Sequence, residues 1–154
     1  MAVIVIVGQQ EEEKEQEEKE RRIVQAVPGA VAEAEGVRVT LHEVVDPWVE
    51  EGLFEAPQPG TRYVAIRVSL ENVGDGDHAL YSSNFDLKTS SYDGEVTFFK
   101  AEPDLFAPGP FLNLSSGARA EGWVTFVVAE GAGLTMLKYD PSLVTTNDVE
   151  FHWE

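Results

Sequence analysis

The fold is decided by residues 62–73, which read RYVAIRVSLENV. Val64, Ile66, Val68 and Leu70 recur at every second position, and the intervening residues are mostly polar. A helix would need apolar residues at steps of three and four, whereas a period of two places them on one face of a strand. The stretch therefore predicts a β-strand with one face in a core and the other in water.

Similar segments recur along the chain, separated by turn residues. Strands are predicted at residues 31–34, 37–45, 80–87, 96–99, 119–128, 134–139 and 149–153. Residues 119–128 are apolar on both faces, which is typical of a central or covered strand. No amphipathic helix is expected after residue 22. Seven to eight short strands with turns at regular spacing predict an all-β fold of two antiparallel sheets packed face to face.

The composition narrows the classes of partner and chemistry. A chain of 154 residues is expected to form one domain with a tail to spare. Its 28 acidic and 11 basic residues give a net charge of −17, which repels phosphate backbones, so no nucleic-acid partner is expected. The acidity favours solubility and would suit a high-salt environment. The absence of cysteine excludes disulfides, thiolate zinc sites and a cysteine nucleophile.

The apolar N-terminal segment, residues 1–8, has two interpretations. Residues 2–7 read AVIVIV, which is much shorter than the roughly 20 residues that span a bilayer. The segment is either the remnant of a membrane anchor or a short strand that pairs with a sheet edge. If the strand pairs with a neighbouring copy, the protein is a self-assembling homo-oligomer. Deleting residues 1–8 tests this alternative, because an unchanged particle mass would count against it.

Residues 9–22 differ sharply in composition from the rest of the chain. Seven glutamates precede or alternate with four basic residues, and several acid–base pairs are spaced at i and i+4. Such pairs support an isolated helix by a few tenths of a kcal/mol each, and bases near the C-terminal end suit the helix dipole. No apolar stripe is present, so a coiled coil is not expected. The segment predicts a charged stalk, helical or disordered, before a sandwich domain at residues 23–154.

The order of these signals is distinctive. A strand at residues 36–44 precedes a proline-rich loop and the segment 60–74, and residues 114–128 and the motif Tyr139-Asp140-Pro141 come later in the chain. Together they resemble the DUF4352 family of immunoglobulin-like β-sandwich domains, which are similar to the mycobacterial secreted antigen MPT63. The resemblance covers about residues 27–153.

The resemblance implies an immunoglobulin-like sandwich in an extracellular or cell-envelope protein. Members often carry an N-terminal signal or lipid anchor followed by a low-complexity linker, which favours the anchor-remnant interpretation of residues 2–7. The family supplies no agreed catalytic residues to carry over to this chain.

The histidines give no metal-binding pattern. His42, His78 and His152 have no partner at metal-ligand spacing and are expected to be surface residues without a chemical role. Were the first and last strands adjacent, His42 and His152 would approach each other near Glu43 or Glu150.

Asp75 and Asp77 flank a glycine in the turn after the principal strand and are weak calcium candidates. The EF-hand loop pattern and its closing glutamate are missing, and turn chemistry explains both residues. No serine lies in a nucleophile elbow, and no glycine-rich phosphate loop occurs. We therefore expect no catalytic residue, metal or cofactor, although the many carboxylates leave a chance glycosidase-like pair open.

Four aromatic residues lie in the two long loops of the chain. They are Trp48, Phe54, Phe106 and Phe111. If these loops meet at one end or edge of the sandwich, the four side chains would form an apolar patch for a partner; otherwise they cap the core.

These observations favour a non-enzymatic secreted or cell-envelope domain that acts as a protein-interaction or structural module. Membrane anchoring would run through residues 2–7 or a segment upstream of them. The alternatives are the self-assembling subunit and a metal-dependent or carboxylate-based enzyme. Metal analysis of the purified protein distinguishes the enzyme from the non-enzymatic module, because a stoichiometric ion that is lost on changing His42 or Asp77 would favour the enzyme.

Overall fold

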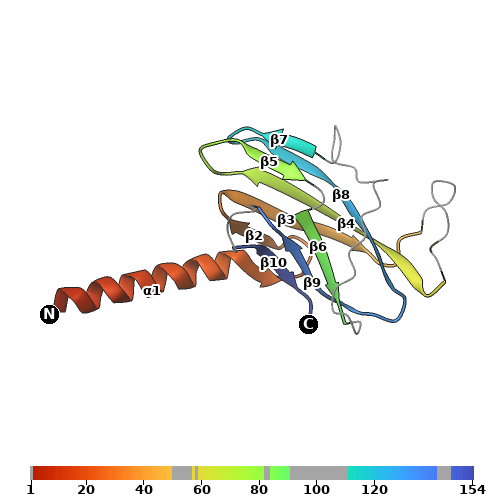
Figure 1. Ribbon diagram of the computed structural model, residues 1–154, viewed down its shortest axis with the longest axis horizontal. Coiled ribbons are helices and arrows are strands. Elements are labelled where there is room, and N and C mark those ends of the chain that lie inside the picture. Colours follow the sequence, from red (N-terminus) through yellow and green to blue (C-terminus); the bar gives the residue numbers. More distant parts are fainter. Residues whose placement is uncertain (1, 50–56, 58, 82–83, 91–110, 142–146) are drawn as a thin grey trace.

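Strands are the main secondary structure in a computed structural model, which describes residues 2–49, 57, 59–81, 84–90, 111–141 and 147–154 (Figure 1). The elements are α1 (Ala2–Arg22), β1 (Ile23–Gln25), β2 (Val31–Ala34), β3 (Val37–Val45), β4 (Thr61–Asn72), β5 (His78–Tyr81), β6 (Phe85–Thr89), β7 (Phe111–Leu114), β8 (Arg119–Ala129), β9 (Leu134–Tyr139) and β10 (Val149–His152).

The described strands form two four-stranded sheets and one smaller pair. Sheet I has the order β1-β10-β9-β6, sheet II has the order β2-β3-β4-β8, and β5 pairs with β7. Apolar residues of both large sheets meet in one core, so the predicted face-to-face sandwich is confirmed. Val39, Ile66, Val68 and Phe126, which the period of two places inside, are all 0% exposed.

The principal strand, β4, lies inside sheet II. It pairs antiparallel with β3 on one side and with β8 on the other, from Thr61 opposite Ala129 to Glu71 opposite Arg119. A register shift between Leu41 and Glu43 marks a bulge in β3. Because every second β4 residue faces the core, its position fixes the inner layer of sheet II.

The strand pattern differs from the prediction in several places. The predicted segment 80–87 is divided between β5 and β6, while β1 and β7 were not predicted; residues 96–99 lie outside the described residues. Among the described residues β8 pairs with β4 alone, so it ends the strand order of sheet II and is not central; the loop that was the alternative cover for it lies largely outside the described residues. The pair β1–β10 is parallel, whereas a wholly antiparallel fold was expected. Short strands such as β1 carry too few residues for a period of two to be recognised.

The outer face of sheet II is less exposed to solvent than the period of two in β4 predicted. Ser69 is 3% exposed and its hydroxyl is 2.9 Å from Nε2 of the half-buried His42. Further along the same face, Ala65 and Thr125 are buried as well. Arg67 and Glu71 keep their contact with water.

The helix α1 includes the predicted stalk and extends it through residues 2–8 (Figure 1). Residues 2–7 are helical in this single chain rather than the short strand that was one of the two alternatives; a role as an anchor remnant and pairing with a neighbouring copy stay predictions. Exposed charged residues occupy most of the helix from residue 11, and Lys19, Arg21 and Arg22 stand in its last turn, where they favour the dipole. Among the described residues, no helix has the length and hydrophobicity needed to cross a membrane.

Candidate functional site

Within the described residues, one polar side chain at each end of β4 makes several hydrogen bonds, some of them to distant segments. The two residues are Arg62, which precedes Val64, and Asn72, which follows Leu70, and both lie on the side of the strand that faces the core. We call the network at Arg62 the arginine clamp and the network at Asn72 the asparagine clamp.

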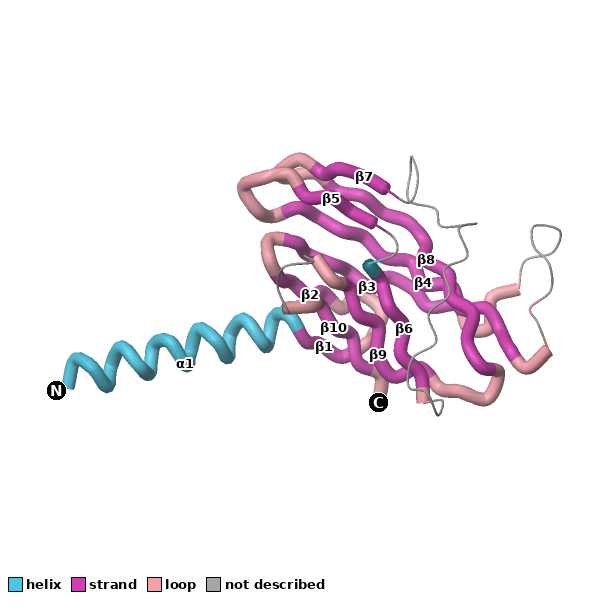
Figure 2. Tube along the Cα trace, in the orientation of Figure 1, coloured by secondary structure: helices cyan, strands magenta, loops and turns pink. Residues whose placement is uncertain are grey.

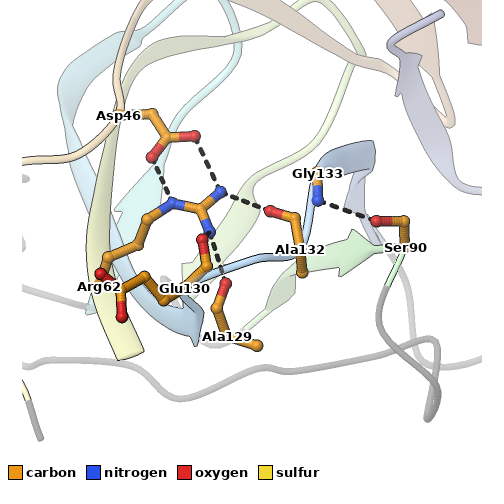
Figure 3. A network of polar contacts seen from close by, with 7 residues as sticks. All are labelled: Asp46, Arg62, Ser90, Ala129, Glu130, Ala132 and Gly133. Carbon is orange, nitrogen blue, oxygen red and sulfur yellow. Dashed lines mark hydrogen bonds and ion pairs between the residues drawn. The ribbon is translucent and has the colours of Figure 1, made fainter. Parts of the chain in front are cut away.

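The arginine clamp uses every N–H donor of one guanidinium (Figure 3). Nε and one terminal nitrogen of Arg62 donate to the two carboxylate oxygens of Asp46, at 2.6 and 3.1 Å. The remaining donors reach the backbone carbonyls of Ala129, Glu130 and Ala132, the last two at 2.8 and 2.6 Å. One side chain thereby joins the end of β3, the start of β4 and the turn from β8 to β9.

This clamp has little capacity to bind anything else. The hydrogen bond with Asp46 raises the pKa of Arg62, so its positive charge is permanent. Both carboxylate oxygens of Asp46 and all five guanidinium donors are already engaged. The arrangement fixes a turn between the two sheets rather than presenting a free charge to a ligand.

A serine extends the clamp toward sheet I. The backbone N–H of Gly133 donates to the Ser90 hydroxyl at 2.8 Å (Figure 3), and the N–H of Ser90 donates to the Gly133 carbonyl at 2.9 Å. Ser90 follows β6, so the β8–β9 turn is held from both sheets.

The asparagine clamp is buried and uncharged. The side-chain amide of Asn72 donates to the carbonyls of Gly76 and Leu114, at 2.6 and 2.9 Å, and its oxygen accepts from the N–H of Gly74 at 3.0 Å. Asn72 is 2% exposed. Its backbone N–H also donates to the carbonyl of Ala118, so this residue joins β4, β7 and the turn before β8.

Glycines let two turns meet beside this clamp. The N–H groups of Val73 and Gly74 donate to the carbonyl of Gly36, at 2.9 and 3.1 Å. A Cβ built on Gly36 would lie 3.3 Å from the Cα of Gly74, and Gly36 has a φ of +78°. A side chain at position 36 would therefore be strained and would crowd the neighbouring turn.

A histidine–tyrosine pair lies where β5 meets sheet I. Nε2 of His78 is 2.7 Å from the hydroxyl of Tyr139, whose ring is fully buried. Burial lowers the pKa of His78 and, together with nearby Asp140, raises the pKa of Tyr139. Both groups are therefore neutral near pH 7, and the tyrosine hydroxyl can donate to the imidazole.

The predicted aromatic patch is only partly within the described residues. Trp48 is half-buried just after β3, with its ring centroid 6.2 Å from that of Tyr63 and its backbone N–H donating to the Tyr63 carbonyl at 2.7 Å. Phe111 begins β7 rather than lying in a loop. Phe54 and Phe106 lie outside the described residues, so a patch formed by all four stays a prediction.

The calcium candidates sit on an exposed turn. Asp75 and Asp77 are both exposed, and neighbouring carbonyls already accept hydrogen bonds from the protein: that of Gly76 from Asn72 and that of Gly74 from Ser116. Within the described residues, no three histidine, aspartate or glutamate side chains gather as a metal site.

The other histidines are in different sheets. His42 belongs to β3 of sheet II, whereas His152 belongs to β10 of sheet I, so the two are not on adjacent strands. Nε2 of His152 is 2.8 Å from the Glu150 carboxylate on its own strand.

Sequence reasoning missed both clamps, although one signal was present. Arg62 and Asn72 continue the period of two that buries Val64 to Leu70, so the same pattern extends the core face to both polar side chains, although we did not draw that prediction from it. A polar residue there requires partners. Those partners come from distant segments, and no local motif indicates them.

Comparison with known proteins identifies the family. A model of the DUF4352 family, described as a domain of unknown function, matches residues 28–149. No curated protein sequence matches the chain at a significant level.

Solved structures resemble the chain in fold. The ycdA protein of Bacillus subtilis, a candidate lipoprotein, aligns with a TM-score of 0.63 and 16% identity over 82% of this chain; the chain spans only 38% of that protein. The yjhA protein of Bacillus subtilis aligns with a TM-score of 0.58 and 18% identity, over 82% of this chain and 98% of its own.

The secreted protein MPT63 of Mycobacterium tuberculosis aligns with a TM-score of 0.49 and 16% identity, over 75% of this chain and 82% of its own. The match to the family model spans most of the chain, as the sequence resemblance predicted. The chain therefore belongs to the DUF4352 family of β-sandwich domains.

Proposed function

We propose that this protein is a non-enzymatic secreted or cell-envelope module, in which a charged helix holds a binding or structural sandwich away from a surface. The observation that carries the proposal is the placement of α1, which stands clear of the strand layers for most of its length (Figure 2). Its exposed residues from position 11 are predominantly charged, which suits a solvated spacer. The likeness to the candidate lipoprotein ycdA is consistent with this location.

The chemistry of the described residues supports binding rather than catalysis. The two clamps use their polar groups internally, and Arg38 and Arg67 are each paired with two glutamates on neighbouring strands. With these bases neutralised, the surplus acids dominate the surface charge. A partner with a basic surface would be attracted by this field, and its association would slow at high salt.

Location is tested on intact cells of the organism that makes the protein. Protease added outside should remove the sandwich, as followed with an antibody, while a cytoplasmic control protein survives until the cells are lysed. A sandwich protected to the same degree as the control would contradict the proposal.

A further inference from the structure

The joint between the helix and the sandwich has an unusual geometry. Helix α1 ends at Arg22 and β1 begins at Ile23, so no loop separates them. Within the described part of the chain, β1 pairs with β10 alone and runs parallel to it, with Val24 opposite Phe151. Tension applied through the helix therefore enters the sandwich at the β1–β10 pair.

Because β1 and β10 are parallel, the direction of the pull determines whether their hydrogen bonds are loaded together or one after another. A pull on the helix draws β1 toward its own N-terminal end, while the body of the sandwich, held elsewhere, retains β10. The two strands are then loaded along their length, and their hydrogen bonds carry the load together. If both strands were pulled from the same end, the bonds would break one after another at a lower force.

Side chains reinforce this pair at both ends. A terminal nitrogen of Arg22 donates to the Asp148 carbonyl at 3.2 Å and lies 3.6 Å from the Glu150 carboxylate. At the other end, the Gln25 amide donates to the Glu154 carboxylate at 3.0 Å. The N–H of Ala26 adds a backbone bond to the His152 carbonyl at 2.7 Å.

The pair is also attached to the core. Val149 and Phe151 of β10 are both 0% exposed, and β10 is bonded to β9 on its other side. On β1, Val24 packs against the core, and so does Ala26 just after the strand. Sliding β1 along β10 would therefore break apolar contacts as well as hydrogen bonds.

We propose that β1 and β10 form a shear clamp that lets the sandwich bear tension delivered through α1. This mechanical role rests on the proposed function, in which α1 tethers the sandwich to a surface. The helix is the compliant part in series, since side-chain hydrogen bonds of its exposed residues, from Gln16 to Glu20 and from Arg21 to the Glu17 carbonyl, are local. Extending its 21 residues would lengthen the tether by about 40 Å before the clamp is loaded to rupture.

Single-molecule pulling on the purified full chain tests the proposal. Because the chain has no cysteine, two introduced cysteines define the handles. Ala2→Cys with a cysteine added after Glu154 loads the pair in shear, whereas Ala2→Cys with Asn147→Cys pulls both strands from the same end. We expect a severalfold higher rupture force in shear at equal pulling speed, and equal thermal midpoints. Equal forces in both geometries would overturn the proposal.

A matched pair of substitutions identifies the reinforcing side chain. Arg22→Ala should lower the rupture force in shear, whereas Arg21→Ala should leave it unchanged, because the Arg21 side chain donates to the Glu17 carbonyl within the helix. Equal effects of the two changes would also overturn the clamp. Rupture force is independent of where cells place the protein, so this failure is distinguishable from failure of the proposed location.

Discussion

The two ends of β4 are held by different chemistry. At its start, Arg62 is a charged fork whose side chain is 15% exposed, and it joins a surface turn to Asp46. At its end, Asn72 is a neutral amide that is 2% exposed and bonded to backbone groups. Water can partly replace a lost partner at the Arg62 end of β4 but not at the Asn72 end. The loss of Asn72 should therefore lower the unfolding free energy more than the loss of Arg62.

The largest loss is expected from Asn72→Ala. It leaves the carbonyls of Leu114 and Gly76 without their donor, which should lower the unfolding free energy by about 3 kcal/mol. Urea titration measures the loss, and Asn113→Ala, on an exposed position of β7, is the control. Equal losses in the two variants would show that the buried amide is not a clamp.

Arg62→Lys should rank second, at about 2 kcal/mol. Lysine keeps the positive charge but cannot donate to Asp46 and three carbonyls from one planar group. Arg119→Lys, on an exposed position of β8, is the matched control and should change little. If Arg62→Lys proved as stable as the parent, the positive charge alone, without the fork of five donors, would explain the stabilisation at the start of β4.

A pH-dependent effect of smaller size is expected at His78. Its pKa is lowered in the folded state by burial, so the unfolded chain binds the proton more readily. The stability contributed by neutral His78 should be present above its ordinary pKa of about 6.5 and decline as the pH falls below that value. His78→Gln should remove this part of the pH dependence, measured by urea titration at several pH values. An unchanged slope, or the same change in the exposed His152→Gln, would argue against it.

The smallest effect is expected on the outer face of sheet II. Arg38→Gln breaks exposed ion pairs with Glu33 and Glu71 and should cost less than about 0.5 kcal/mol. The measurement is again the unfolding free energy. A loss as large as that of Arg62→Lys would mean that exposure does not separate the two arginines.

The sequence predicted the sandwich because one feature, the period of two in residues 62–73, is both local and tied to burial. It did not predict β1 or β7, since their three and four residues show no period and their pairing partners are distant. The same limit applies to the site. The positions of Arg62 and Asn72 on the core face could be predicted, but Ala132 and Leu114 become their partners only through the tertiary fold.

The contrast between charged and neutral clamps is tested most directly by salt. Unfolding free energies of the parent, Arg62→Met and Asn72→Ala are compared between about 0.05 M and about 1 M sodium chloride. The loss caused by Arg62→Met should shrink at high salt, because ions screen its pairing with Asp46, while the loss caused by Asn72→Ala should stay the same. Losses that change in parallel would contradict the account.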